Sequence, residues 1–196
     1  ECNLHVRNGT GISTSYTAAP NGLGNLIVGY NEGDPNGGEK TGSHNVIVGA
    51  YHTYTKHSGL VTGESNTIAG NGAAVIGGTN NVASASSSMV SGGTMNTASG
   101  VYSSVSGGSG NEATGWYATV SGGEENMASG NFSSVSGGEK NTASGTKSSV
   151  SGGGNNAASA WASSVSGGGT NVAAGDYSSV SGGAWNWTIT DYGTLP

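Results

Sequence analysis

Apolar and polar positions recur along this chain with a fixed period of fifteen residues. In each unit a valine is followed six residues later by an asparagine, and in all but the last unit an alanine comes two residues after that. The valines are Val75, Val90, Val105, Val120, Val135, Val150, Val165 and Val180, and the asparagines are Asn81, Asn96, Asn111, Asn126, Asn141, Asn156, Asn171 and Asn186. Self-similarity at a fixed period is typical of repeat architectures, in which each unit packs on its neighbours. The sequence therefore predicts a repeat protein.

One unit contains two short apolar segments and two corners. The segment Ser104-Val105-Ser106 alternates, so its valine faces one side of a strand and its serines the other. Gly107-Gly108 permits a sharp corner. Residues 111–114 offer a second short strand with Ala113 inward, and Gly115 permits the return. Two strands and two corners per unit predict an all-β fold, a parallel β-solenoid or β-roll of about ten 15-residue coils.

Stacking of such coils has consequences for the core. Coils lie about 4.8 Å apart, so equivalent residues form columns, and inward asparagines can pair their amides with the coils above and below. Each coil buries about one valine and one alanine, which is little against the backbone entropy of fifteen residues. We therefore expect a homotrimer with the valine strands facing a common axis. A monomer with a small private core is the alternative.

The first third of the chain departs from the regular period. Residues 1–24 are expected to form an irregular N-terminal segment or junction, and residues 25–190 the repeat head. Within the head, 25–29 and 45–49 are related apolar segments, both predicted as buried strands, and the polar, glycine-rich residues 31–43 are predicted as a loop insertion. Residues 191–196 are expected to form a C-terminal cap or tail, because Thr188 and Thr190 replace the usual alanine and glycine.

Composition and charge narrow the class of protein. The 39 glycines and the small apolar share would also suit a disordered chain, but the strict period argues against disorder. The net charge of -6 with five basic residues argues against nucleic-acid binding and against direct contact with an anionic membrane surface. Cys2 is the single cysteine, so the fold uses no internal disulfide.

The residues that carry chemistry are scattered. His5, His44, His52 and His57 lie in the irregular third without clustered carboxylates, which is a weak metal signal. The acids fall singly or in adjacent pairs at variable corners and are not placed for acid–base work. We expect no catalytic residue, no metal site, no cofactor and no enzymatic activity.

Aromatic residues occupy positions of the fifteen-residue unit that differ from one copy to the next. Three residues before the valine, or beside that position, stand Tyr102, Trp116, Tyr117, Phe132, Trp161 and Tyr177. Stacked on one edge, such side chains can hold sugars or a protein partner, so these six are the candidate binding residues. The alternative is that they cover the glycine-rich corners and pack between neighbouring chains.

The repeat resembles the head repeat of trimeric autotransporter adhesins of the YadA type. Residues 134–145 read Ser-Val-Ser-Gly-Gly-Glu-Lys-Asn-Thr-Ala-Ser-Gly, beside approximately Ser-Val-Ala-Ile-Gly-x-x-Ser-x-Ala-x-Gly in that family, and the likeness covers about residues 45–190. The resemblance implies a left-handed parallel β-roll, three chains around one axis, and display on the bacterial outer membrane for attachment. Three departures are the period of fifteen rather than fourteen, glycine in place of isoleucine except at Ile76, and asparagine in place of serine.

The resulting expectation is an extracellular adhesin or fibre head that mediates attachment to a host or target surface, with a surface glycan or protein as ligand. A phage fibre is a second setting for the same head. Two other functions stay open: a structural spacer rod of a surface or phage fibre, and an ice-binding solenoid. The latter is expected to present threonine rows, whereas serine dominates here.

Overall fold

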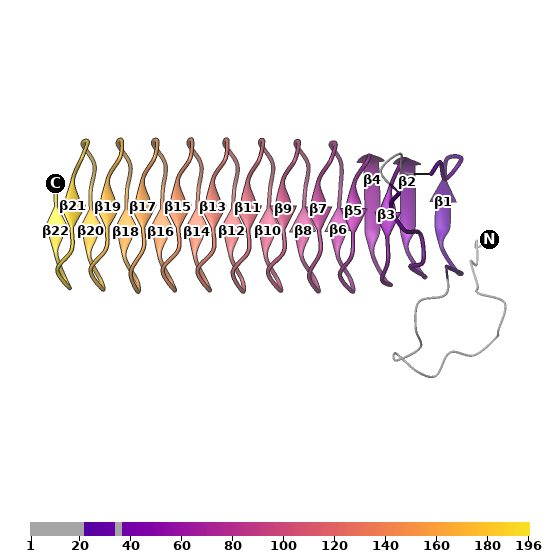
Figure 1. Cartoon of the computed structure of the whole chain (residues 1–196), viewed down its shortest axis with the longest axis horizontal. Coiled ribbons are helices and arrows are strands. Elements are labelled where there is room, and N and C mark those ends of the chain that lie inside the picture. The colour runs from indigo at the N-terminus through magenta and orange to yellow at the C-terminus, as the bar shows by residue number, and fades with distance from the viewer. Residues whose placement is uncertain (1–21, 34–36) are drawn as a thin grey trace, which may run out of the picture.

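The chain folds into an elongated rod of stacked coils (Figure 1). The structure, a computed structural model, describes residues 22–33 and 37–196. Across these two ranges every strand belongs to one of two parallel sheets, and there is no helix, so none that could cross a membrane. The predicted all-β parallel solenoid of about ten coils is confirmed. Residues 1–21, most of the expected N-terminal segment, lie outside the described residues.

The two sheets differ in the apolar residue that they turn inward. The valine sheet has twelve strands in the described part of the chain: β1 (Leu26–Val28), β2 (Val46–Ala50), β4 (Leu60–Glu64), β6 (Ala74–Val75), β8 (Met89–Val90), β10 (Ser104–Val105), β12 (Thr119–Val120), β14 (Ser134–Val135), β16 (Ser149–Val150), β18 (Ser164–Val165), β20 (Ser179–Val180) and β22 (Thr194–Leu195). The alanine sheet has ten there: β3 (Thr53–Tyr54), β5 (Thr67–Ile68), β7 (Val82–Ala83), β9 (Thr97–Ala98), β11 (Glu112–Ala113), β13 (Met127–Ala128), β15 (Thr142–Ala143), β17 (Ala157–Ala158), β19 (Val172–Ala173) and β21 (Trp187–Thr188).

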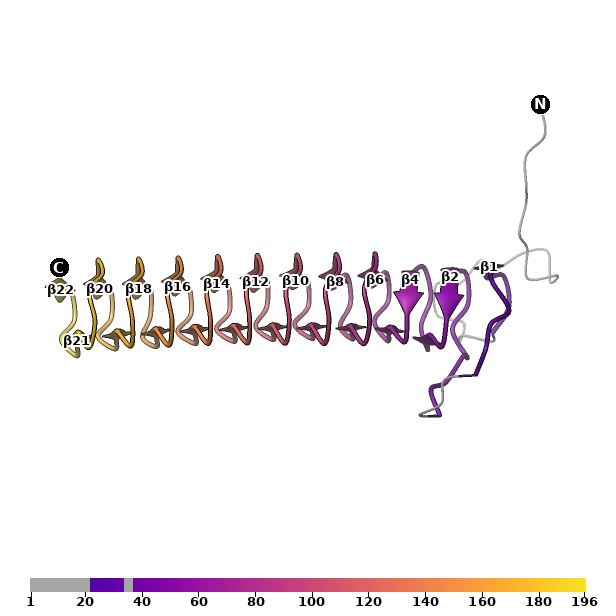
Figure 2. The same cartoon turned by 90° about the horizontal axis from the view of Figure 1, so that it is seen from above.

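Successive coils place equivalent residues over one another. Val105 pairs with Val90 and Val120, and Ala113 pairs with Ala98 and Ala128. The two sheets lie on opposite sides of the rod, as the turned view shows (Figure 2). With about 4.8 Å between neighbouring parallel strands, the valine sheet is about 50 Å long from β1 to β22.

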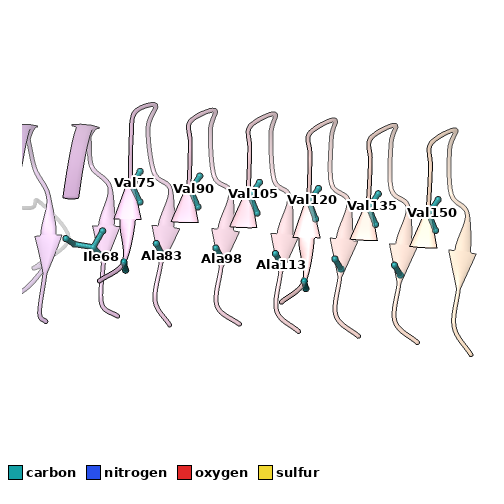
Figure 3. Close-up of a cluster of buried hydrophobic side chains, with 14 of the residues drawn as sticks. Ile68, Val75, Ala83, Val90, Ala98, Val105, Ala113, Val120, Val135 and Val150 are labelled. Atoms are coloured by element: carbon teal, nitrogen blue, oxygen red, sulfur yellow. The ribbon is translucent and has the colours of Figure 1, made fainter. Parts of the chain in front are cut away.

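The core is a single file of apolar pairs inside the roll (Figure 3). Each regular coil buries one valine and one alanine, such as Val105 and Ala113, both fully inaccessible to solvent. Larger side chains fill the N-terminal coils, where Tyr54 and Ile68 occupy the alanine column. The core of a regular coil is therefore thin, and the coils need a second source of cohesion.

The N-terminal coils differ from the rest in length as well as in core size. Ile47, Val61 and Val75 pair in register although each step is fourteen residues, because Gly49 and Gly63 each stand alone where later coils have a glycine pair. The described parts of the 31–43 insertion return along the outer edge of β3, where the Tyr54 N–H donates to the Glu39 carbonyl oxygen (3.0 Å). At the other end, residues 191–196 include β22, which pairs with β20.

Candidate functional site

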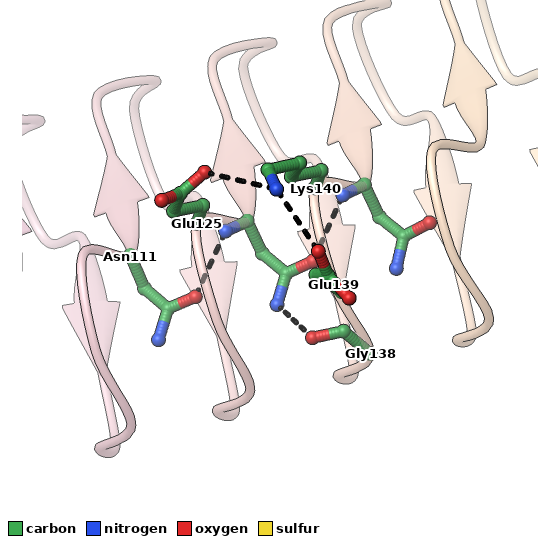
Figure 4. Close-up of polar contacts among 7 residues, drawn as sticks. Asn111, Glu125, Gly138, Glu139 and Lys140 are labelled. Atoms are coloured by element: carbon green, nitrogen blue, oxygen red, sulfur yellow. Dashed lines mark hydrogen bonds and ion pairs between the residues drawn. The ribbon is translucent and has the colours of Figure 1, made fainter.

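The asparagines form a continuous hydrogen-bonded column, which we call the asparagine ladder (Figure 4). In a typical member, Nδ2 of Asn126 donates to the carbonyl oxygens of Gly122 in its own coil and Gly138 in the next, each at 2.9 Å. Oδ1 of Asn126 accepts the backbone N–H of Asn141, also at 2.9 Å. Each amide thus bonds three backbone groups across two coils, and the Gly138 carbonyl oxygen also accepts the Glu124 N–H (2.9 Å). These bonds supply the cohesion that the thin core lacks.

The corner beside the ladder requires glycine. Gly138 has a φ of 90°, in the left-handed region. A Cβ there would collide with the carbonyl oxygen of Gly153 in the next coil and approach Nδ2 of Asn141 to 2.6 Å. Because neighbouring coils approach so closely here, the carbonyl oxygen of each such glycine reaches the asparagine side chain of the preceding coil. This position is glycine in every regular coil.

His52 takes the place of an asparagine at the start of the ladder. Its Nδ1 accepts the N–H of Asn66 (3.2 Å), and its Nε2 therefore carries the proton and donates to the carbonyl oxygen of Val48 (3.1 Å). Burial lowers the pKa of His52, and Lys40 lowers it further. This histidine therefore has a structural role. In the described ranges no three His, Cys, Asp or Glu side chains lie close enough together to hold a metal ion.

The candidate binding residues lie at one corner of each coil. The residue three before each valine has a left-handed backbone: φ is 58° at Tyr102, 55° at Tyr117 and 59° at Phe132. This conformation is costly for residues with a Cβ. It recurs because the corner N–H is bonded to the preceding coil, as from Phe132 to the Trp116 carbonyl oxygen (2.7 Å). The corner conformation is thus independent of which side chain it carries.

Aromatic side chains line this corner, which we call the aromatic edge. Its members are Tyr102, Trp116, Tyr117, Phe132, Lys147, Trp161, Tyr177 and Tyr192. The rings of Tyr102 and Tyr117 stack at 4.8 Å between centroids and 14° between planes, and those of Tyr117 and Phe132 at 5.2 Å and 5°. About half of each of these side chains is exposed. The first part of the edge is therefore a three-ring stack.

The second part of the edge mixes a cation with rings. The ammonium of Lys147 lies 5.2 Å from the ring centroid of Trp161, a cation–π contact. Trp161 meets Tyr177 edge-on at 4.4 Å, and Tyr177 stacks on Tyr192 at 4.9 Å and 6°. The indole of Trp161 thereby contacts both side chains that flank Ala162 in the column.

The opposite edge carries charged side chains in its middle coils and one exposed ring, Trp185, at its C-terminal end. Lys140 lies 2.9 Å from a carboxylate oxygen of Glu139 and 3.7 Å from one of Glu125 (Figure 4). The hydrogen bond to Glu139 and the charges of both glutamates raise the pKa of Lys140. Exposed ion pairs of this kind contribute little to stability.

The outer side of the valine sheet is covered with hydroxyl groups. Two rows flank the buried valines: Ser104, Thr119, Ser134, Ser149, Ser164 and Ser179 before them, and Ser106, Ser121, Ser136, Ser151, Ser166 and Ser181 after them. Towards the N-terminal end the same side becomes apolar, with Val28, Val46, Ile76 and Met89 exposed.

Five of the six predicted binding residues take part in ring contacts on one edge. The sixth, Trp116, is 59% exposed there and belongs to none of the ring pairs in the described chain. Sequence reasoning missed Tyr192, which the fifteen-residue step from Tyr177 marks, and Lys147, whose contact with Trp161 no spacing rule indicates.

No protein-family model matches this chain, and a search of curated proteins finds no match either.

Proposed function

We propose that this chain is an extracellular attachment module, the head of an adhesin or fibre, that binds a surface glycan or protein along its aromatic edge and catalyses no reaction. The observation that carries the proposal is the row of half-exposed aromatic rings along one edge. The corner backbone has the same conformation without these rings, so the fold does not require them. Exposed aromatic side chains gathered along one edge are typical of contact surfaces. A rigid rod places several such contacts in line.

The resemblance to YadA-type heads suggests an oligomeric state and a location for the chain. The steps from Ile47 to Val61 and from Val61 to Val75 are fourteen residues, the period of that family's repeat. We propose a left-handed homotrimer at a bacterial or phage surface. The exposed Val28, Val46, Ile76 and Met89 on the valine sheet support chain–chain contact on that side. Light scattering tests this: a particle of about three times 19.0 kDa is expected, and a single-chain mass would contradict it.

Attachment is tested by placing fluorescent beads coated with the chain on arrays of glycans and of matrix proteins. The unaltered chain is expected to bind a subset of spots. A variant with Tyr102, Trp116 and Tyr177 changed to serine is expected to lose that binding. The control is Met95→Ser, which removes an equally exposed apolar side chain from the opposite edge. If the unaltered chain binds no spot, the attachment function is refuted.

One observation favours the spacer rod instead. The ring of Tyr117 is covered on both sides by its neighbours in the stack, so this ring already serves the rod itself. If light scattering finds a trimer and the beads bind no spot on the arrays, the spacer rod is supported.

A different observation favours an ice-binding solenoid. The valine sheet presents two straight rows of hydroxyl groups, repeated at about 4.8 Å along the rod, and a crystalline surface is a partner of matching periodicity. Thermal hysteresis of a freezing solution of the chain is the measurement that decides for or against it.

A further inference from the structure

The three-ring stack has one free ring face at its N-terminal end. Tyr117 has a ring on each side, whereas the ring of Tyr102 stacks on Tyr117 alone among the described residues. On its other side the preceding position in the column is Ser87, whose side chain is too short to cover a phenol ring. Tyr102 is 53% exposed. The edge therefore offers an unoccupied aromatic face directed along the rod.

The column of Tyr102 carries no ring for the three coils next to that face. Going back from Tyr102, the column holds Ser87, Gly72 and Ser58, each with the same left-handed backbone (φ of 55°, 65° and 63°). The corner is continuous there, because the Ser87 N–H donates to the Asn71 carbonyl oxygen (2.9 Å) as in later coils. Three coil spacings give about 14 Å of exposed edge beside the ring. We call it the ring-free stretch.

The polar groups of the ring-free stretch indicate the ligand's chemistry. Ser58 and Ser87 present hydroxyls, and the neighbouring column adds Asn71 and Ser86, both exposed, and the half-buried His57, whose Nδ1 lies 3.1 Å from the Ser58 hydroxyl. The serine and asparagine side chains nearest Tyr102 donate and accept hydrogen bonds but carry no charge. An apolar ring face beside uncharged hydroxyls and an amide suits a molecule with an apolar C–H face and several hydroxyl groups.

We propose that neutral hexopyranose units of a glycan bind at the ring-free stretch, with one sugar ring stacked on the free face of Tyr102. The site rests on the proposed attachment function and specifies where and what it binds. The sugar takes the position that the next ring of the stack would occupy, at the level of Ser87. Hydroxyl groups of the sugar reach Ser86, Ser87 and Asn71.

The test blocks the site in one variant and removes its aromatic face in another. Ser87→Tyr extends the stack by one ring, and its corner accepts the change because Tyr102, Tyr117 and Tyr177 have the same φ to within a few degrees. Tyr102→Ala removes the free face instead. Ser151→Tyr, on the exposed outer side of the valine sheet, is the matched control. Far-UV circular dichroism checks that each variant is folded.

Cellohexaose, maltohexaose and mannohexaose are titrated into the labelled chain and followed by amide chemical shifts. We expect saturable shifts at Ser87 and Tyr102 with at least one sugar. Affinity should fall on the order of tenfold in Ser87→Tyr and in Tyr102→Ala, and stay unchanged in Ser151→Tyr. Equal affinity in all four proteins, or no binding of any of the three sugars, would overturn the assignment.

The bead assay with the same variants separates this site from the proposed function. Beads that attach equally well with Ser87→Tyr refute the site and leave attachment intact. Sugar binding that depends on Tyr102, together with no attachment by the unaltered chain, refutes the function and leaves the site intact.

Discussion

Replacing one interior asparagine by alanine measures what the asparagine ladder contributes. In Asn126→Ala, the N–H of Asn141 loses its acceptor and the carbonyl oxygens of Gly122 and Gly138 lose a donor. An unsatisfied buried backbone group costs about 1–3 kcal/mol. The Asn141 N–H lies in the interior and bears the full cost, whereas the exposed Gly138 carbonyl oxygen still accepts the Glu124 N–H and water can replace the lost donor. We therefore expect a loss of about 2–4 kcal/mol, not three full penalties.

Urea unfolding followed by far-UV circular dichroism measures the free energy, and hydrogen exchange of the Asn141 amide gives a local readout. The control is Ser133→Ala, seven residues further along the chain and equally buried. The Ser133 hydroxyl has no hydrogen-bond partner, and the same column holds Ala118 one coil earlier. Its removal should be neutral or slightly stabilising. An Asn126→Ala variant with a free energy of unfolding within about 0.5 kcal/mol of the control would show that the asparagine ladder adds no cohesion.

Three further predictions concern other positions of the same frame. Asn186→Ala should cost about 1 kcal/mol or less in urea unfolding, because this last ladder amide donates only to Gly182; a loss as large as at an interior asparagine would contradict this. Gly138→Ala should destabilise by at least about 2 kcal/mol, while Gly137→Ala, where a Cβ meets open space, should be nearly neutral; equal thermal shifts would refute the corner argument. The fold keeps His52 neutral, whereas the unfolded chain gains a proton near pH 6.5, so stability should fall as the pH drops below about 6.5. His52→Asn should flatten that part of the pH profile, and an unchanged slope would refute the assignment.

The period was enough to predict the two-strand coil and the parallel stacking. Residues that recur at one spacing must share one environment, and a coil of two strands with glycine corners provides it. The period alone does not indicate that Trp161 contacts Lys147 and Tyr177 of the adjacent column, because those contacts depend on side-chain rotamers. It also hides His52 as a ladder member, since the coil is one residue shorter and histidine replaces the amide.

The candidate site was partly predictable for a similar reason. That Tyr102, Tyr117 and Phe132 are neighbours follows from their spacing, so a contact surface could be expected on one edge. Which ring faces are covered does not follow from spacing. The stack occupies both faces of Tyr117, and only ring orientation identifies the free face of Tyr102.

The larger N-terminal core gives the chain a starting point for folding. The regular coils are nearly interchangeable, so a strand slipped by one whole coil would still lay valine on valine. Tyr54 and Ile68 have no equivalents among the later coils, and a nucleus formed around them has only one correct partner. We expect winding to proceed from there towards the C-terminus, in the order in which a ribosome would deliver the coils. If pulsed hydrogen exchange finds that the amides of β3 and β5 are protected last, the folding nucleus lies elsewhere.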